Sequence, residues 1–310
     1  MKIAFIYGGQ GSQVEEMGKD LYEEYDFIKD FYDSIELDFP LKDLSFRGDL
    51  ETISRTKYTQ PILLAFQIAV TKVLKHHGIQ PDIAFGLSLG EYSALYAGGV
   101  LGEEDLFQII QYRSTEMDKA SKGLDSKMLA VFTDDIEGLE ELCKRYSGEG
   151  IFAQISNINT KGQIVISGDS NIVTDISQEL KKEKYRFIEL NTSGPFHTSY
   201  MDGVSEKLEK YFSGIEFKDP ELPIIHNFYG SFKEDVDIKE AMWKQVNHPV
   251  LFKSSIEELL EEDPDLIIEI GYGNVIKGLV RRVDRSVEVK PVNTVESIEK
   301  LVKEVGKDGR

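Results

Sequence analysis

One serine lies between two glycines in the segment Gly86-Leu87-Ser88-Leu89-Gly90. The apolar residues 82–86 predict a strand that leads into this segment, and residues 91–97 predict a helix that follows it. A G-x-S-x-G string between a strand and a helix is typical of a strained turn that exposes a serine hydroxyl beside the N–H groups of a helix start. Ser88 is therefore the candidate nucleophile, and a purely structural turn is the alternative.

A serine nucleophile needs a base within hydrogen-bond reach, and histidine is the usual one. His197 ends the segment Ser193-Gly194-Pro195-Phe196-His197, which follows a strand predicted over 185–190. Active-site residues of α/β proteins gather in loops at the carboxyl ends of strands. His197 is therefore the best placed of the five histidines. His76 and His77 end a predicted helix, and His226 and His248 suit structural roles.

The elements around these residues alternate in type along the chain. Strands are predicted at 2–7, 82–86, 266–270 and 287–292, with helices between them. The helix predicted over 59–77 has Thr59 as its cap and Pro61 in its first turn. Such alternation is typical of a parallel sheet. We therefore expect an α/β fold, with a large α/β-hydrolase-like catalytic domain built from residues 1–125 and 194–310.

Residues 126–193 follow a different rhythm. Strands are predicted at 127–132, 151–155, 163–167 and 185–190, and helices at 136–146 and 172–183. This βαββαβ order predicts a ferredoxin-like subdomain inserted in the larger domain.

Composition narrows the classes of function. The 310 residues carry a formal net charge of −19, which repels phosphates and argues against nucleic acid as a partner. No apolar stretch approaches the ~20 residues that cross a bilayer, so no membrane is expected. The single Cys143 cannot form an internal disulfide, which favours the cytoplasm.

Several separated segments resemble one family, the malonyl-CoA:acyl carrier protein transacylases, together with the acyltransferase domains of fatty acid and polyketide synthases. They follow the family's order from residue 9 to residue 271 and cover nearly the whole chain. The matching segments are Gly9-Gln10-Gly11-Ser12-Gln13, Thr59-Gln60-Pro61, Ser88-Leu89-Gly90-Glu91-Tyr92, Arg113 with Met117, Asn157-Ile158-Asn159 with 163–168, Phe196-His197, Gln245 with Pro249-Val250, and Glu269-Ile270-Gly271. Each is a weak signal alone, but the ordered set is specific.

The resemblance implies an acyltransferase of fatty acid biosynthesis, an acyl-carrier-protein S-malonyltransferase that works by a ping-pong mechanism. Ser88 would take the malonyl group from malonyl-CoA, with His197 as its base, and pass it to the phosphopantetheine thiol of acyl carrier protein. The backbone carbonyl of Gln245 would orient His197. The backbone N–H groups of Gln10 and Leu89 would form the oxyanion hole. The implied partners are a coenzyme A thioester and acyl carrier protein, with no metal and no tightly bound cofactor.

The same resemblance implies the substrate-binding residues. Arg113 would bind the free carboxylate of the malonyl group, because a guanidinium holds a carboxylate through two parallel hydrogen bonds. Phe196, beside the base, would crowd a branched acyl group. Asn157, Asn159 and Gln163 would complete the substrate site.

Three positions depart from the family's pattern. Leu87 stands where the family has His, while Gly8 and Tyr272 each stand where it has Pro. Gly8 loosens the loop that carries Gln10, because glycine adopts many backbone conformations. The exact acyl preference therefore stays open.

Other functions also stay open. An acyl hydrolase or editing thioesterase would use water in place of the carrier thiol, and a trans-acting polyketide synthase acyltransferase would serve another pathway. A non-catalytic module that docks carrier proteins would keep the fold without needing Ser88 and His197. A dinucleotide site at Gly271-Tyr272-Gly273 lacks its third glycine, because Ile276 stands there.

Overall fold

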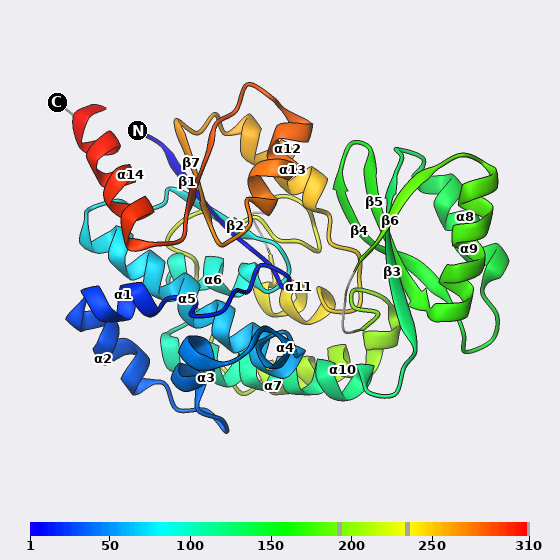
Figure 1. Ribbon diagram of the computed structural model, residues 1–310, viewed down its shortest axis with the longest axis horizontal. Coiled ribbons are helices and arrows are strands. Elements are labelled where there is room, and N and C mark those ends of the chain that lie inside the picture. Colours follow the sequence, from blue (N-terminus) through cyan, green and yellow to red (C-terminus); the bar gives the residue numbers. More distant parts are fainter. Residues whose placement is uncertain (191–193, 233–235, 309–310) are drawn as a thin grey trace. The chain divides into compact units, whose positions relative to one another are not determined.

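The computed structural model describes residues 1–190, 194–232 and 236–308 (Figure 1). These residues form two compact units. The first unit consists of Met1–Ser114, Phe217–Ile225 and the chain from Leu259 onward, and the second of Thr115–Glu216 and His226–Glu258. Each unit contains one four-stranded sheet.

The sheet of the first unit is parallel throughout and has the strand order β2-β1-β7-β8. The strands are β1 (Ile3–Tyr7), β2 (Ile83–Gly86), β7 (Leu266–Ile270) and β8 (Val289–Val292). Their near-continuous apolar residues suit a sheet that is covered on both faces. Tyr7 is in register with Gly86 on one side and Ile270 on the other, so these three strands end together. The predicted parallel α/β sheet is confirmed.

Helices surround this sheet. Those with residues in the first unit are α1 (Lys19–Glu24), α2 (Asp26–Ser34), α3 (Leu41–Arg47), α4 (Leu50–Ile53), α5 (Thr56–His76), α6 (Gly90–Ala97), α7 (Glu103–Ser121), the end of α12 (Phe252–Glu261), α13 (Val275–Val283) and α14 (Val295–Asp308). The helix α7 begins in the first unit and ends in the second. No helix in the described part of the chain is both long and apolar enough to cross a membrane.

The start of α5 differs from the prediction. The helix begins at Thr56, and Pro61 lies in its interior rather than in its first turn. Thr59 is not the cap, because its hydroxyl lies within donating distance of the carbonyl oxygens of Ile53 (2.6 Å) and Arg55 (3.0 Å). A cap would instead accept a hydrogen bond from a backbone N–H group of the first turn.

The sheet of the second unit is antiparallel and has the order β4-β5-β3-β6. Its strands are β3 (Ser126–Phe132), β4 (Ala153–Thr160), β5 (Gln163–Asp169) and β6 (Arg186–Leu190). The helices α8 (Ile136–Tyr146) and α9 (Ser170–Lys182) lie together on one face of this sheet (Figure 1). Apolar residues of the helices and of the facing strand positions form the core between them.

The strand β4 continues beyond its predicted end at 155. Two register irregularities, between Ile155 and Asn157 and between Ile158 and Thr160, let the strand carry polar residues and still pair with β5. On its other side Val250 pairs with β4, because Ile158 N–H donates to the Val250 carbonyl at 2.9 Å and Val250 N–H donates to the Ser156 carbonyl at 3.0 Å.

The second unit also contains a short 3₁₀ helix (Ser199–Met201), α10 (Asp202–Phe212), α11 (Ile238–Lys244) and the first part of α12 (Phe252–Glu261). The predicted insertion, residues 126–193, lies inside this unit, apart from 191–193, which lie outside the described residues. The unit is larger than the insertion because segments such as the one around Val250 pack with the antiparallel sheet. The domain boundaries at 125 and 194 stay a prediction.

Candidate active site

The turn between β2 and α6 has the backbone geometry of a nucleophile elbow. Ser88 has a φ of +53°, a left-handed conformation that is strained for a side chain other than glycine. A Cβ atom on Gly86 would lie 2.1 Å from the Gly90 carbonyl carbon, and a Cβ on Gly90 would lie 2.3 Å from the Tyr7 carbonyl oxygen. Both flanking glycines are therefore required by close approach, and they hold Ser88 between strand and helix.

The loop after β1 packs directly on this elbow. Leu87 N–H donates to the Tyr7 carbonyl at 2.9 Å. A Cβ atom on Gly9 would lie 2.8 Å from the Leu87 carbonyl oxygen, so only glycine fits there. Ser12 Oγ donates to the Gly9 carbonyl at 2.8 Å and closes the loop. These contacts place the residue between Gly9 and Gly11, which is Gln10, beside the elbow.

The two residues predicted to form the oxyanion hole, Gln10 and Leu89, belong to these segments. Leu89 is buried and stands at the start of α6, and its N–H group has no hydrogen-bond acceptor among the residues that the structure describes. A helix start concentrates such N–H groups and a positive partial charge, which favours a developing oxyanion. The Gln10 side chain donates to Thr56 Oγ1 at 3.1 Å, and its oxygen lies 3.5 Å from Gln60 Nε2. The start of α5 thus holds Gln10.

Arg113 is fully buried and contacts the candidate nucleophile. Its Nη2 donates to Ser88 Oγ at 3.3 Å, and its Nη1 donates to Gln60 Oε1 at 2.7 Å. The guanidinium carbon lies 5.4 Å from the ring centre of Tyr92, a cation–π distance. Burial lowers the pKa of Arg113, and Tyr92 and Glu91 oppose that shift. A fully buried cation therefore lies beside the candidate nucleophile.

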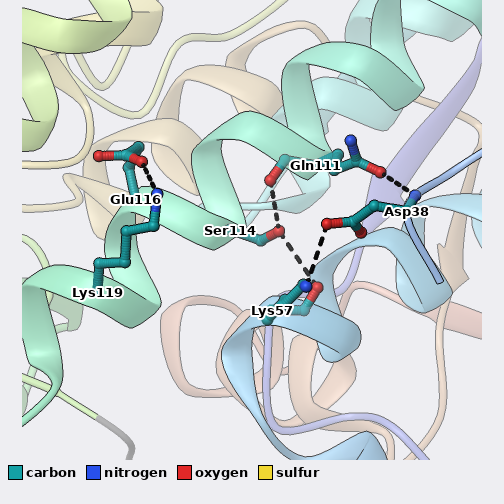
Figure 2. A network of polar contacts seen from close by, with 6 residues as sticks. All are labelled: Asp38, Lys57, Gln111, Ser114, Glu116 and Lys119. Carbon is teal, nitrogen blue, oxygen red and sulfur yellow. Dashed lines mark hydrogen bonds and ion pairs between the residues drawn. The ribbon is translucent and has the colours of Figure 1, made fainter.

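Polar contacts attach α7 to α5 beside Arg113 (Figure 2). Ser114 Oγ shares its proton between the carbonyl of Lys57 at 3.3 Å and that of Gln111, in its own helix, at 3.2 Å. Lys57 Nζ in turn pairs with the Asp38 carboxylate at 3.1 Å, and Asp38 N–H donates to Gln111 Oε1 at 2.8 Å. Because Gln111 and Ser114 flank Arg113 on α7, this network fixes the turn of helix from which the guanidinium extends.

The candidate base lies in the second unit. His197 is 6% exposed and has a φ of +60°. Its Nδ1 lies 2.8 Å from the Gln245 carbonyl oxygen, and its backbone N–H donates to the Val246 carbonyl at 2.9 Å. Because a carbonyl only accepts, Nδ1 carries the proton, and in a neutral ring Nε2 then carries the lone pair. The ring is therefore oriented and in the tautomer that a general base requires.

A groove of about 460 Å³ within the second unit reaches His197. Phe152 and Gln154 line it from the sheet, and Ser199 from the segment after the base. Gln154 and Ser199 exchange two hydrogen bonds, from Gln154 Nε2 to Ser199 Oγ at 3.2 Å and from Ser199 N–H to Gln154 Oε1 at 2.8 Å. These bonds join β4 to the chain that follows His197.

Phe196, the residue before the base, is 8% exposed. A Cβ atom on Gly194 would lie 2.1 Å from Ser121 Oγ and 3.0 Å from the Phe196 ring. The described part of the loop therefore packs tightly on the end of α7, and glycine is needed for that approach.

The three predicted amide residues lie on the hairpin of β4 and β5. Asn159 Nδ2 donates to Gln163 Oε1 at 3.4 Å, and Asn157 Oδ1 accepts from Ser156 Oγ at 3.0 Å. The structure thus brings Asn159 and Gln163 together, and Asn157 faces its own neighbour. Their role toward a substrate stays a prediction.

The predicted site residues form one group in each unit. Ser88, Leu89, Gln10 and Arg113 belong to the first unit, whereas His197, Phe196, Gln245 and the hairpin amides belong to the second. The pairing of Ser88 with His197 joins a residue of each unit and stays a prediction.

Three further residues of the first unit contact this group or the loop that carries Gln10, and no role in the site was predicted for any of them from the sequence. Gln60 bridges Gln10 and Arg113, Tyr92 faces the guanidinium, and Gln67 bonds the loop after β1. One sequence pattern could have indicated Gln60 and Gln67. They are the two amides in an otherwise apolar stretch of α5, and their spacing of seven residues places them on the same side of a helix.

The parallel sheet and the strained serine between β2 and α6 define the class of protein, which is an α/β enzyme built around a nucleophile elbow. The family model described as the acyl transferase domain matches residues 4–308. The chain therefore belongs to the acyl transferase domain family.

Named relatives agree with this assignment. A malonyl CoA-acyl carrier protein transacylase of Bacillus subtilis (strain 168) is 40% identical over 303 residues, which cover 96% of this chain and 95% of the relative. The crystal structure of malonyl CoA-acyl carrier protein transacylase from Clostridium perfringens is similar with a TM-score of 0.93 at 31% identity, covering 100% of this chain and 98% of the other. A malonyl-transacylase in complex with its type II PKS acyl-carrier protein has a TM-score of 0.91 at 28% identity and covers 98% of this chain and 100% of the other.

Proposed function

We propose that this chain transfers the malonyl group of malonyl-CoA to the phosphopantetheine thiol of acyl carrier protein in fatty acid biosynthesis. Ser88 is the nucleophile, His197 the general base, and the N–H groups of Gln10 and Leu89 the oxyanion hole. Relatives that bear the name malonyl CoA-acyl carrier protein transacylase, and that match 96% of this chain, support this proposal.

The observation that carries the proposal is the contact between Arg113 and Ser88. A buried guanidinium 3.3 Å from the nucleophile oxygen is suited to an acyl group that ends in a carboxylate. In a malonyl ester of Ser88 a single methylene separates the ester carbonyl from that carboxylate. A neutral acyl group has no carboxylate to accept charge-assisted hydrogen bonds from this guanidinium, which disfavours acetyl-CoA. Phe196 crowds a branched acyl group beside the base.

The reaction consists of two balanced half-reactions. His197 Nε2 takes the Ser88 proton while Oγ attacks the thioester carbon of malonyl-CoA, and the C–S bond breaks as the proton passes to the departing coenzyme A sulfur. The carrier thiol then gives its proton to His197 while its sulfur attacks the ester carbon, and the C–O bond to Ser88 breaks as the proton returns to Oγ. Transfer between two thioesters involves no oxidation or reduction, so the scheme calls for no cofactor besides the two substrates.

Arrangement and location belong to the same proposal. We interpret the first unit as α/β-hydrolase-like because its strained serine follows a parallel strand, and the antiparallel sheet as ferredoxin-like because its chain order is βαββαβ. We assign the catalytic domain to residues 1–125 with 194–310, and the inserted subdomain to residues 126–193. A cytoplasmic location suits a chain whose one cysteine, Cys143, is buried and unpaired.

The intact mass of the protein after mixing with malonyl-CoA tests the function. We expect a malonyl adduct that persists until phosphopantetheinylated acyl carrier protein is added and then moves to the carrier. Ser88→Ala should show no adduct, whereas Ser34→Ala, a serine of α2 outside the site, should retain it. Rapid release of free malonate without carrier protein would instead identify a hydrolase.

A further inference from the structure

The loop that carries Gln10 begins at Gly8, where the resembled family has proline. Proline would restrict this backbone, whereas glycine leaves it free and makes it entropically harder to hold in one conformation. An oxyanion donor contributes fully only when its position is fixed before the reaction. Other interactions must therefore hold the backbone of Gly8 in place.

Both polar backbone groups of Gly8 have partners in the first unit. Its N–H donates to the Ile270 carbonyl at the end of β7 at 3.1 Å, a bond that a proline could not form. Its carbonyl accepts from Gln67 Nε2 at 2.7 Å. Gln67 is fully buried in the middle of α5. The loop is thus held from β7 on one side and from α5 on the other.

The Gln67 amide also reaches the helix of the nucleophile. Its Oε1 accepts from Ser93 Oγ at 2.5 Å, and Ser93 is fully buried on α6, the helix that starts at the elbow. The orientation of the amide is fixed by this pairing, because the hydroxyl donates to one end and the Gly8 carbonyl accepts from the other. One side chain therefore joins the oxyanion loop to the elbow helix.

We infer that Gln67 is a positioning residue for the acyl transfer. Its amide holds the Gly8 carbonyl and so keeps the backbone N–H of Gln10 aligned with that of Leu89, replacing the restriction that proline provides in the resembled family. The inference rests on the proposed function, because only a reaction through an oxyanion makes the alignment of these N–H groups matter. The inference goes beyond that function because it names the residue that fixes the geometry of the oxyanion hole.

The acylation rate of Ser88 by malonyl-CoA in single-turnover experiments tests the inference. Gln67→Met keeps the length of the side chain and Gln67→Leu shortens it, and neither variant offers a donor to the Gly8 carbonyl. Both should lower the maximal acylation rate roughly tenfold or more, up to the roughly hundredfold that complete loss of one oxyanion donor costs. The malonyl-CoA concentration that gives the half-maximal rate should stay within about twofold of the wild-type value, because the Gln67 amide does not contribute to substrate binding.

Thr71→Val is the matched control. Thr71 lies one turn after Gln67 on α5, donates to the Gln67 backbone carbonyl at 2.7 Å and lies 3.0 Å from the Tyr7 hydroxyl, so it belongs to the same buried network without contacting Gly8. This variant should lower the melting temperature but not the acylation rate. Equal slowing of acylation in Thr71→Val and Gln67→Met would show that the network acts on stability alone and would overturn the inference.

A second measurement separates the positioning of Gly8 from a general loss of stability in Gln67→Met. Gly8→Ala restricts the backbone at a position whose added Cβ would lie 3.3 Å from Ser12 Oγ, a contact that a small hydroxyl shift relieves. In the Gly8→Ala background Gln67→Met should slow acylation less than in the wild type, and equal slowing would contradict the inference. If wild-type protein forms no malonyl ester, the proposed function itself fails. A wild-type ester with an unslowed Gln67→Met refutes only the positioning role.

Discussion

Ser114 Oγ lies 3.3 Å from the carbonyl oxygen of Lys57 and 3.2 Å from that of Gln111, and its hydroxyl proton is shared between the two carbonyls. The Lys57 carbonyl belongs to the residue four positions before Pro61, which has no N–H group to offer it. A serine of α7 thus supplies the bond that proline removes from α5. Because Arg113 is the neighbour of Ser114, the defect in α5 is also the attachment point of the helix that carries the arginine.

Ser114→Ala should therefore destabilise the protein by about 1 kcal/mol, the usual contribution of a buried hydrogen bond. In a Pro61→Ala background, which restores the helical N–H, the same substitution should have a smaller effect on the free energy of unfolding. Denaturant unfolding of the four proteins of this double-mutant cycle measures the difference. Ser121→Ala is the control, since Ser121 Oγ donates to the Met117 carbonyl of its own helix. Equal losses in both backgrounds would show that Pro61 plays no part.

Arg113→Ala should reduce malonyl transfer far more than acetyl transfer. The guanidinium donates to Ser88 Oγ and is fully buried, so a carboxylate that binds it gains charge-assisted hydrogen bonds that an acetyl group cannot form. We expect kcat/KM for malonyl-CoA, relative to acetyl-CoA, to fall on the order of a hundredfold. Arg47→Ala, an arginine exposed on α3, is the control. An equal fall for both substrates would make Arg113 a structural residue.

Local patterns in the sequence predicted some elements closely. The strand predicted over 266–270 has the bounds of β7, because a short buried strand is a continuous apolar run. The turn around Ser88 was also predictable, since its glycines, strand and helix are neighbours in the chain. The start of α5 was not, because the Thr59 hydroxyl serves carbonyls before the helix instead of capping it.

Other features depend on partners that are distant in the chain. The strand β4 continues through Asn157 because Val250, far along the sequence, pairs with it. Gln67 reads as a single polar residue in an apolar helix until Gly8 and Ser93 are placed beside it. The contact of Arg113 with Ser88 likewise depends on how α7 lies in the first unit. Residue types therefore predicted which groups do chemistry, whereas tertiary structure decides what holds them.

His197→Ala should abolish formation of the malonyl adduct while the protein remains folded. The imidazole is oriented by the Gln245 carbonyl at 2.8 Å, and no other side chain of the chain is proposed to take the Ser88 proton. We expect the acylation rate to fall at least about a thousandfold, as when a nucleophile loses its base. Circular dichroism and the melting temperature check the fold. His226→Ala and His248→Ala should both keep their acylation, and a loss in either with activity retained in His197→Ala would relocate the base.

Glu116 should make the stability of the protein depend on pH at the acidic end. Its carboxylate is 7% exposed and pairs with Lys119 at 2.7 Å (Figure 2) and with Lys207 of α10 at 2.5 Å. Burial alone would raise the pKa of Glu116, but the hydrogen bonds from Lys119 and Lys207 outweigh it, and the pKa lies below its ordinary value of 4.5. The folded state therefore favours the charged carboxylate.

A lowered pKa stabilises the folded state above the pKa of the unfolded chain, and this contribution disappears as the pH falls through the folded pKa. Glu116→Gln should thus destabilise the protein at pH 7, by about 1 kcal/mol or less because both lysines are largely exposed. The difference from wild type should shrink as the pH falls below about 4.5 and disappear below the pKa of folded Glu116, where both proteins carry a neutral group at this position. Unfolding by urea from pH 7 to pH 3 measures it. A difference that stays constant with pH would show that the carboxylate charge contributes nothing and that only the shape of the side chain matters.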